Sequence, residues 1–267
     1  MARAAAAVVV LVALLAAARA PALDEELKTV PTRPGVTDSF LLVKPAGPPV
    51  ASVILFAGGH GGLALSERGI GWGEGNFLVR NRRRFAGHGL LVVVIDAPSD
   101  RRAHGLWNFR TSAEHAEDVK AAMAALRGLA NVPVWVVGTS MGTISAANAA
   151  ARLTDGGPDG VVLTSSVTRT SRMTGESVRM VKLDRITAPT LLVHHAHDQC
   201  VVTPYGDMSS VLKDLKQARK KELLAFDGGD PPRSDPCEPF AAHGYLGLDA
   251  EVVAAIARWI TGVGKAS

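Results

Sequence analysis

The sequence is poor in cysteine and in aromatic residues, and it contains neither a linker-like stretch nor an internal repeat. Aromatic residues make up 5% of the 267 residues and charged residues 20%. The charged fraction is close to that of globular proteins, so the composition does not fit a disordered or fibrous chain. With no linker to divide it, the chain from residue 23 to residue 267 is predicted to form one domain, long enough to bury a substantial core.

A strong excess of positive charge is also missing, since the formal net charge is only +4. The clearest basic cluster, at residues 80–84, has no aromatic residues interleaved with its arginines. Grooves that bind nucleic acids combine basic side chains with aromatic ones. The cluster is therefore interpreted as a solvated helix face, and no nucleic-acid partner is expected.

The N-terminus has the layout of a secretory signal peptide over residues 1–22. Arg3 precedes an apolar run at 4–18, and Ala-Pro-Ala at 20–22 provides an A-x-A exit. The run is too short to span a bilayer comfortably, and Arg19 interrupts its extension. We expect a mature chain that starts at Leu23 and is exported, periplasmic or secreted, with no stable membrane anchor. An uncleaved anchor is the alternative, and no cysteine near the exit supports a lipid anchor.

Only two cysteines are present, Cys200 and Cys237. In a reducing cytosol they would be expected to stay unpaired, but an exported chain favours a disulfide between them.

Apolar runs bounded by turn residues recur along the chain and predict strands. They are continuous rather than alternating, as expected for strands covered on both faces. The runs lie at residues 50–57, 90–96, 133–138, 160–165, 190–195 and 222–227, after a lead-in strand at 39–43.

Segments with helical spacing lie between these runs. Residues 111–126 open with a capping box, Thr111 with Glu114, and 249–260 form a last amphipathic helix. The alternation predicts an α/β fold with a mostly parallel central sheet and helices on both faces.

Residues 138–142 read Gly-Thr-Ser-Met-Gly between an apolar run and a small-residue helical segment. G-x-S-x-G at a strand-to-helix turn exposes a serine hydroxyl above a sheet. Glycine is needed on both sides because the turn is strained and its neighbours pack too closely for a β-carbon. Ser140 is therefore the candidate nucleophile.

A serine nucleophile needs a base and a group that orients the base, and open α/β sheets place such groups after strand ends. Asp198 follows the strand predicted at 190–195, and His243 lies in the loop before the last helix. Asp227, at the end of another predicted strand, is the rival acid. Only His243 among the eight histidines stands in the right place in the order, which is serine, acid, histidine.

With these residues in place, the sequence resembles the α/β-hydrolase superfamily from about residue 50 to residue 260. The resemblance implies that Ser140 is the nucleophile, Asp198 the orienting acid and His243 the general base. It also implies an oxyanion hole in which the backbone N–H of Met141 is one donor. The second donor would come from the loop Ala-Gly-Gly-His-Gly-Gly at 57–62, whose order departs from the usual H-G-G-G, and Gly59 and His60 are the candidates.

The two cysteines lie close in the sequence to the predicted acid and base. Cys200 lies two residues after Asp198, and Cys237 lies six residues before His243. A disulfide between them would tie together the loops that carry the acid and the base, and so help to hold both groups in place.

Residues 194–198, His-His-Ala-His-Asp, invite a zinc interpretation. Successive side chains at a strand end face opposite ways, however, and the spacing misses an H-x-H-x-D pattern by one residue. We expect no metal and no cofactor.

The connection at residues 166–189 is too short for the large helical lid that many superfamily lipases carry, so an open cleft is expected. The predicted function is a serine hydrolase that cleaves short-acyl or surface-exposed carboxylic esters through an acyl-enzyme. Its partner would be a small-molecule or polymer ester, and a monomer is favoured. A peptidase or amidase with the same triad, and a non-catalytic binding protein on this fold, are the alternatives.

Overall fold

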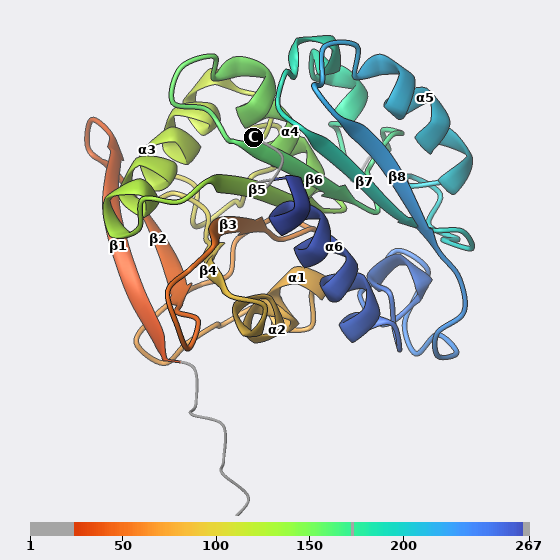
Figure 1. Cartoon of the computed structure of the whole chain (residues 1–267), viewed down its shortest axis with the longest axis horizontal. Coiled ribbons are helices and arrows are strands. Elements are labelled where there is room, and N and C mark those ends of the chain that lie inside the picture. The colour runs from red at the N-terminus through yellow and green to blue at the C-terminus, as the bar shows by residue number, and fades with distance from the viewer. Residues whose placement is uncertain (1–23, 172–173, 264–267) are drawn as a thin grey trace, which may run out of the picture.

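A computed structural model describes residues 24–171 and 174–263, so the predicted signal at 1–22 lies outside the described residues. Eight strands form one sheet in the order β1-β2-β4-β3-β5-β6-β7-β8 (Figure 1). The strands are β1 (Glu25–Arg33), β2 (Val36–Val43), β3 (Ala51–Phe56), β4 (Leu90–Ile95), β5 (Val134–Thr139), β6 (Gly160–Thr164), β7 (Thr190–His195) and β8 (Lys221–Phe226).

The sheet is parallel from β4 to β8 in this order, and only β2 runs against it, since β1 is antiparallel to β2 and so points the same way as β4. β1 pairs with β2, and β2 with β4, in antiparallel registers. Every residue of β3, β4, β5, β6 and β7 is buried. This is why the sequence shows continuous apolar runs there, because a strand covered on both faces has no solvent side. The predicted mostly parallel α/β sheet is confirmed.

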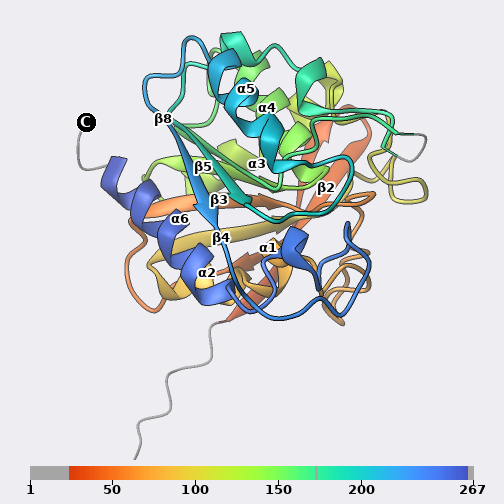
Figure 2. The same cartoon turned by 90° about the vertical axis from the view of Figure 1, so that its right-hand side faces the viewer.

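Helices cover both faces of the sheet, as Figures 1 and 2 show. One layer holds α3, α4 and α5, and the other holds α1, α2 and α6 (Figure 1). The helices are α1 (Phe77–Arg80), α2 (Arg82–Gly87), α3 (Ala113–Leu129), α4 (Gly142–Arg152), α5 (Met208–Asp214) and α6 (Asp249–Val263).

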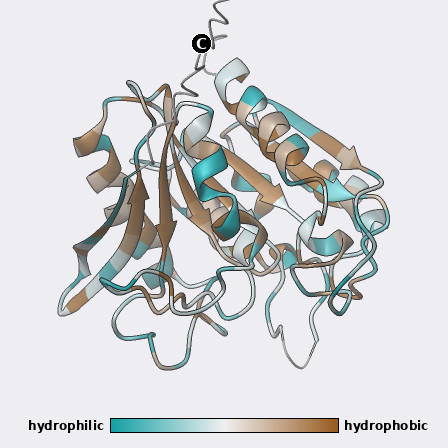
Figure 3. Ribbon diagram, turned by 90° about the horizontal axis from the view of Figure 1, so that it is seen from below, coloured by the Kyte–Doolittle hydropathy of each residue, from teal (hydrophilic) through white to brown (hydrophobic). Residues whose placement is uncertain are grey.

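Each face of the sheet has its own hydrophobic core. One core packs β-strand side chains such as Ile54 and Val136 against α3 and α4, and the other packs Val53 and Trp135 against α2 and α6. Hydrophobic residues accordingly concentrate along the central strands in Figure 3. Alternating side chains of one strand thus serve both cores.

The helix predicted at 111–126 exists as α3, but the predicted cap was wrong by one residue. Ser112, not Thr111, is the N-cap, and its side chain accepts a hydrogen bond from His115 N. The Thr111 hydroxyl instead donates to Glu176 Oε1, at 2.7 Å. A tertiary partner for the threonine therefore displaced the local capping box.

The connection between β6 and β7 carries two single-turn helices among its described residues, η1 (Val178–Met180) and η2 (Leu183–Arg185). This agrees with the prediction of a fold with no large lid. Within the described ranges, no helix combines the length and apolar character needed to cross a membrane.

We expect one buried histidine on α3 to make the fold sensitive to acid. His115 is 3% exposed, lies against the rings of Phe56 and Phe109, and neither ring nitrogen has a hydrogen-bond partner among the described residues. Burial, and then the charges of Arg110 and Arg33, lower the pKa of His115 to about 3. The folded protein thus keeps this imidazole neutral, whereas the unfolded chain protonates it below about pH 6.5.

We predict that His115→Leu makes the protein less sensitive to acid. Between pH 6.5 and pH 3 the unfolded chain binds the extra proton, so wild type loses about 1.4 kcal/mol of unfolding free energy per pH unit through this residue. Denaturant unfolding at pH 7 and pH 5 should show the variant gaining about 2 kcal/mol relative to wild type. His88→Gln, at an exposed histidine, is the control. A difference between wild type and His115→Leu that does not change with pH would contradict the prediction.

Candidate active site

Ser140 sits at the turn between β5 and α4 in a strained conformation. Its φ is 54°, a left-handed value that is uncommon for serine. Its backbone N–H donates to Thr164 O of β6, at 3.0 Å, which anchors the turn to the neighbouring strand. The turn therefore presents Ser140 at the carboxyl end of the sheet, as the sequence predicted.

The glycines on either side of Ser140 are required by backbone contacts. A β-carbon on Gly138 would lie 2.3 Å from Gly142 O, and one on Gly142 would lie 2.1 Å from Phe56 O of β3. No side chain fits at either position. The predicted reason for the G-x-S-x-G pattern thus has a direct steric basis.

Asp198 and His243 come together from loops that are far apart in the sequence. Asp198 follows β7, and His243 lies in the single-turn helix η4 (Ala242–Gly244). His243 Nδ1 lies 2.9 Å from Asp198 Oδ2, and both side chains are buried. Such a contact fixes the orientation of the imidazole and leaves Nε2 as its other nitrogen.

Asp198 is surrounded by hydrogen-bond donors. Cys200 N donates to Oδ1, and the Thr203 hydroxyl donates to Oδ2, each at 2.9 Å. Burial works to raise the pKa of Asp198, but hydrogen bonds from His194 and His243 outweigh it and hold this pKa well below its usual range. Asp198 is therefore an ionised carboxylate at any pH at which the protein would work.

His194 is a second imidazole beside the same carboxylate. Its Nε2 lies 2.8 Å from Thr203 O and 3.4 Å from Asp198 Oδ2. His195 points to the other face of β7, where its Nε2 lies 3.0 Å from Gly228 O. The two histidines therefore point to opposite faces of the strand, as expected for successive residues.

The backbone around His243 is held from the sheet. Ser165 Oγ, just after β6, donates to His243 O at 2.8 Å, and it lies 3.0 Å from the hydroxyl of Tyr245. Tyr245 in turn donates to Val193 O of β7 and adopts a left-handed φ of 58°. A β-carbon on Gly244 would lie 2.1 Å from Pro239 O, so the loop closes tightly beside the histidine.

Ser140 and His243 line one cleft of about 440 Å³. Ser140 Oγ donates to no other described residue, and catalytic hydrogen bonds of this kind often tighten only with substrate bound. Aromatic side chains form much of the wall: Trp72, Trp107 and Phe240 are 46%, 38% and 38% exposed. An apolar cleft with a few polar groups at its base is typical of a small-molecule site.

The glycine loop predicted at 57–62 reaches the same cleft. Gly58 packs so closely on the nucleophile turn that a β-carbon there would lie 3.0 Å from Ser140 Cβ. His60 stacks on Trp72 with ring centroids 3.9 Å apart, and its Nδ1 accepts a hydrogen bond from Gly62 N. Burial, and then the charge of Arg110, lower the pKa of His60. His60 is thus a neutral wall residue.

Three backbone amides near the nucleophile turn have no hydrogen-bond partner among the described residues. Among the described residues, none accepts a hydrogen bond from the backbone N–H of Gly59, His60 or Met141. Buried or half-buried amides without partners are uncommon, and convergent ones form anion sites in acyl-transfer enzymes. Gly59 and His60 line the same cleft as Ser140, and Met141 follows Ser140 in the chain, so their role as an oxyanion hole stays a prediction.

Cys200 and Cys237 form a disulfide, with their Cα atoms 4.6 Å apart. Cys200 is the residue whose N–H binds Asp198, and Cys237 lines the cleft. The bond therefore joins the acid loop to the segment that leads into His243. The predicted pairing is present in the structure.

Several residues of the site carry no signal in the sequence. Thr203, His194 and Ser165 all act through tertiary contacts, and nothing in their spacing marks them. Asp227, the rival acid, is exposed and pairs with His197 at 3.2 Å. The structure therefore brings Asp198, and not Asp227, to the histidine of the cleft.

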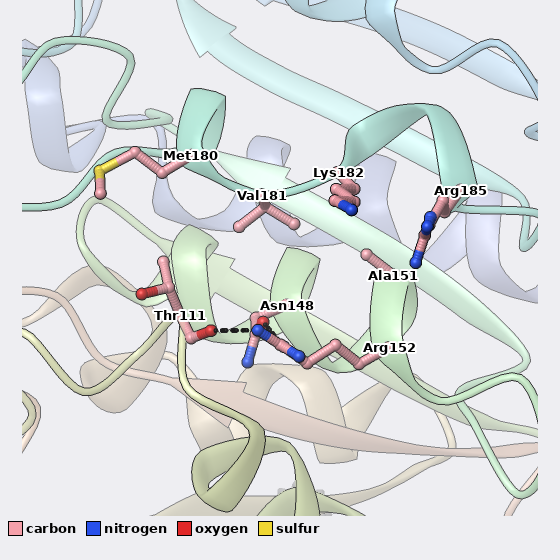
Figure 4. A pocket seen from close by; sticks show the side chains of 8 residues that line it. All are labelled: Thr111, Asn148, Ala151, Arg152, Met180, Val181, Lys182 and Arg185. Atoms are coloured by element: carbon pink, nitrogen blue, oxygen red, sulfur yellow. Dashed lines mark hydrogen bonds between the residues drawn. The ribbon is translucent and has the colours of Figure 1, made fainter.

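Nothing in the described ranges groups three or more His, Cys, Asp or Glu side chains in a way that could hold a metal ion. A second pocket, of about 180 Å³, lies between α4 and the β6–β7 connection (Figure 4). Its lining residues include Arg152, which is already hydrogen-bonded to Asn148 Oδ1 and Thr111 O. It contains no serine, histidine or carboxylate, so it offers no group for acyl transfer.

Solved structures match the chain over most of its length, although no known family profile and no curated protein sequence matches it. A dienelactone hydrolase from Anabaena variabilis is 18% identical, covers 90% of this chain and 96% of its own, and superposes with a TM-score of 0.59. A cold-adapted esterase from an Arctic intertidal metagenomic library is 17% identical, with 91% and 95% covered and a TM-score of 0.61.

An acylaminoacyl peptidase from Pyrococcus horikoshii is also similar, at 12% identity and a TM-score of 0.62, covering 87% of this chain and 41% of the peptidase. At these identities the likeness establishes the fold. The sheet order, the strained serine turn and these neighbours lead to one conclusion: the protein has the fold of the α/β-hydrolase superfamily, with esterases and dienelactone hydrolase among its structural neighbours.

Proposed function

We propose that this protein is a serine hydrolase that cleaves carboxylic esters through a covalent acyl-enzyme. The observation that carries the proposal is the cluster at one end of the sheet. A serine in a strained turn shares a cleft with a histidine whose Nδ1 lies 2.9 Å from an ionised aspartate. This is the arrangement that acyl transfer by a serine nucleophile needs.

In the proposed mechanism Ser140 attacks the ester carbonyl while His243 Nε2 takes its proton. Asp198 stays ionised and holds the imidazole in the tautomer that presents this nitrogen to the serine. The negative charge that develops on the carbonyl oxygen is received by the amide of Met141 and by the glycine loop at Gly59 and His60. His243 then protonates the leaving alcohol and activates water to release the acid.

The substrate we propose is a short-acyl or surface-exposed ester. The described part of the β6–β7 connection carries no helix longer than a single turn, and the aromatic wall is partly open to solvent. An exported location fits the disulfide and the leader-like N-terminal sequence. A peptidase or amidase is the second candidate, favoured by the likeness to the acylaminoacyl peptidase.

We predict that a fluorophosphonate probe labels the wild-type protein and not Ser140→Ala. The probe reacts only with an activated serine, so labelling reports the nucleophile without any assumption about the substrate. Ser165→Ala is not a suitable control because this residue holds His243, whereas Ser210→Ala on α5 is remote from the cleft. If wild type stays unlabelled while it is folded, the protein is a binding protein on this fold and the proposal is wrong.

We expect nitrophenyl esters with acyl chains of two to sixteen carbons to be cleaved fastest at the short end. Trp107→Ala should raise KM about 5- to 30-fold with little change in kcat, because it removes apolar contact made equally in the ground and transition states. The matching nitroanilides test the amidase alternative. A preference for the longest esters, or for the anilides, would contradict the proposed substrate class.

We predict that Cys200→Ser with Cys237→Ser lowers both stability and activity. On the chain-entropy view, the bond that closes this loop contributes roughly 3–4 kcal/mol to the free energy of unfolding. Activity per labelled serine should also fall, because the acid loop loses its tie to the histidine segment. Thermal unfolding and titrated turnover measure the two effects. Unchanged turnover with lower stability would show that the bond serves the fold alone.

A further inference from the structure

Arg110 is a fully buried cation that lies directly beneath the glycine loop. It follows β4, shortly before α3, and is 0% exposed. Its Nη2 donates to Ala57 O at 3.2 Å and to Gly59 O at 3.1 Å. Its Nη1 donates to the Ser145 hydroxyl on α4 at 2.7 Å. One guanidinium thus joins the glycine loop to the helix that follows Ser140.

Hydrogen bonds to three loop carbonyls fix the direction of three of the loop amides. Ala57 O and Gly59 O point at Arg110, and Gly58 O accepts a hydrogen bond from Gly61 N at 3.2 Å. Each peptide unit is planar and trans, so a fixed carbonyl fixes the N–H of the next residue in the opposite direction. The N–H groups of Gly58, Gly59 and His60 are therefore all set by this arrangement.

The loop is shaped to rest on the guanidinium. A β-carbon on Gly61 would lie 2.5 Å from Arg110 Nη2, so only glycine lets the backbone approach this closely. On the other side, a β-carbon on Gly58 would lie 3.0 Å from Ser140 Cβ. The loop therefore lies between Arg110 and the nucleophile turn and packs closely on both.

Stability alone does not account for a cation at this position. No described carboxylate lies within ion-pair distance of Arg110, its Nε has no hydrogen-bond partner, and its partners are neutral oxygens. A buried charge without a paired counter-charge is costly. Burial lowers the pKa of Arg110 to about 10, with Glu176 opposing, so the guanidinium remains charged at neutral pH.

We propose, building on the proposed function, that Arg110 is a positioning residue for the oxyanion hole. It orients the loop amides and places a positive charge behind them, so the tetrahedral oxyanion is stabilised although Arg110 does not touch the substrate. Preorganised donors of this kind act on the transition state far more than on substrate binding. The charge of Arg110 already acts on His60, a wall residue of the cleft.

The test compares Arg110→Met, Arg110→Lys and Ser145→Ala with wild type, and Arg33→Met is the matched control. Arg33 is likewise an arginine with little exposure, but it binds Asp118 and Asp100 and does not contact the glycine loop. Active serines are first titrated to completion with a fluorophosphonate. Turnover of nitrophenyl acetate is then expressed per titrated serine, and the affinity for phenylboronic acid, which forms a tetrahedral anion on the serine, is measured.

We expect Arg110→Met to lower kcat about 10- to 100-fold while KM changes less than about threefold. The affinity for phenylboronic acid should fall by a factor similar to that of kcat. Arg110→Lys, which keeps the charge but has fewer donors, should lie between Arg110→Met and wild type. Ser145→Ala should lower kcat less than Arg110→Met and less than Arg110→Lys. Arg33→Met should lower the unfolding temperature and leave kcat and boronic-acid affinity per titrated serine within about twofold.

The inference is overturned if Arg110→Met keeps kcat and boronic-acid affinity per titrated serine near the wild-type values, or if only KM rises. If Arg110→Met does not fold, Arg110→Lys decides by the same two readouts. A wild-type protein that neither reacts with the fluorophosphonate nor cleaves esters overturns the proposed function together with this inference. An active wild type with an unaffected Arg110→Met overturns this inference alone.

Discussion

The close packing of the turn around Ser140 against the end of β3 is the contact on which the rest of the site depends. A β-carbon at Gly142 would meet the carbonyl of Phe56 at 2.1 Å, so backbone lies against backbone with no side chain between. This contact brings the chain that leaves β3, and with it the glycine loop, beside the nucleophile. It also explains why the serine adopts a strained φ of 54°, since a relaxed turn would not keep both elements so close.

Around that contact the two halves of the site are held in different ways. The nucleophile and the glycine loop belong to the centre of the sheet, where β3, β4 and β5 are buried on both faces. The acid and the base come from loops at the β7–β8 side, and they are held by side chains, by Ser165 and by a disulfide. The geometry of the site thus depends on core packing for one half and on polar and covalent ties for the other.

Sequence patterns were sufficient for the parts that backbone geometry dictates. The apolar run at 190–195 predicted both ends of β7 correctly, and G-x-S-x-G predicted the serine turn. Both were predictable because burial and steric crowding allow few residue types at those positions. The order of Ser140, Asp198 and His243 was also readable, since strand ends gather at one edge of a parallel sheet.

The tertiary partners of the site residues could not be predicted from the sequence. Thr203 beside Asp198, Ser165 beneath His243 and Arg110 beneath the glycine loop have no periodicity or motif. The helix cap at Ser112 was misplaced because Thr111 found a distant partner in Glu176. Such choices are made by contacts between elements that lie far apart in the chain, and one sequence does not contain that information.

The disulfide also bears on the outer limit of the sheet. The ring that it closes, from Cys200 to Cys237, contains α5 and the whole of β8, the last strand on that side. Terminal strands are where sheets begin to fray, because one row of their backbone groups has no partner strand. Because the two flanks of β8 are covalently joined, the strand can leave β7 only as part of a closed loop. We therefore expect fraying of this sheet margin to disturb the loop of the acid and the segment before the base together.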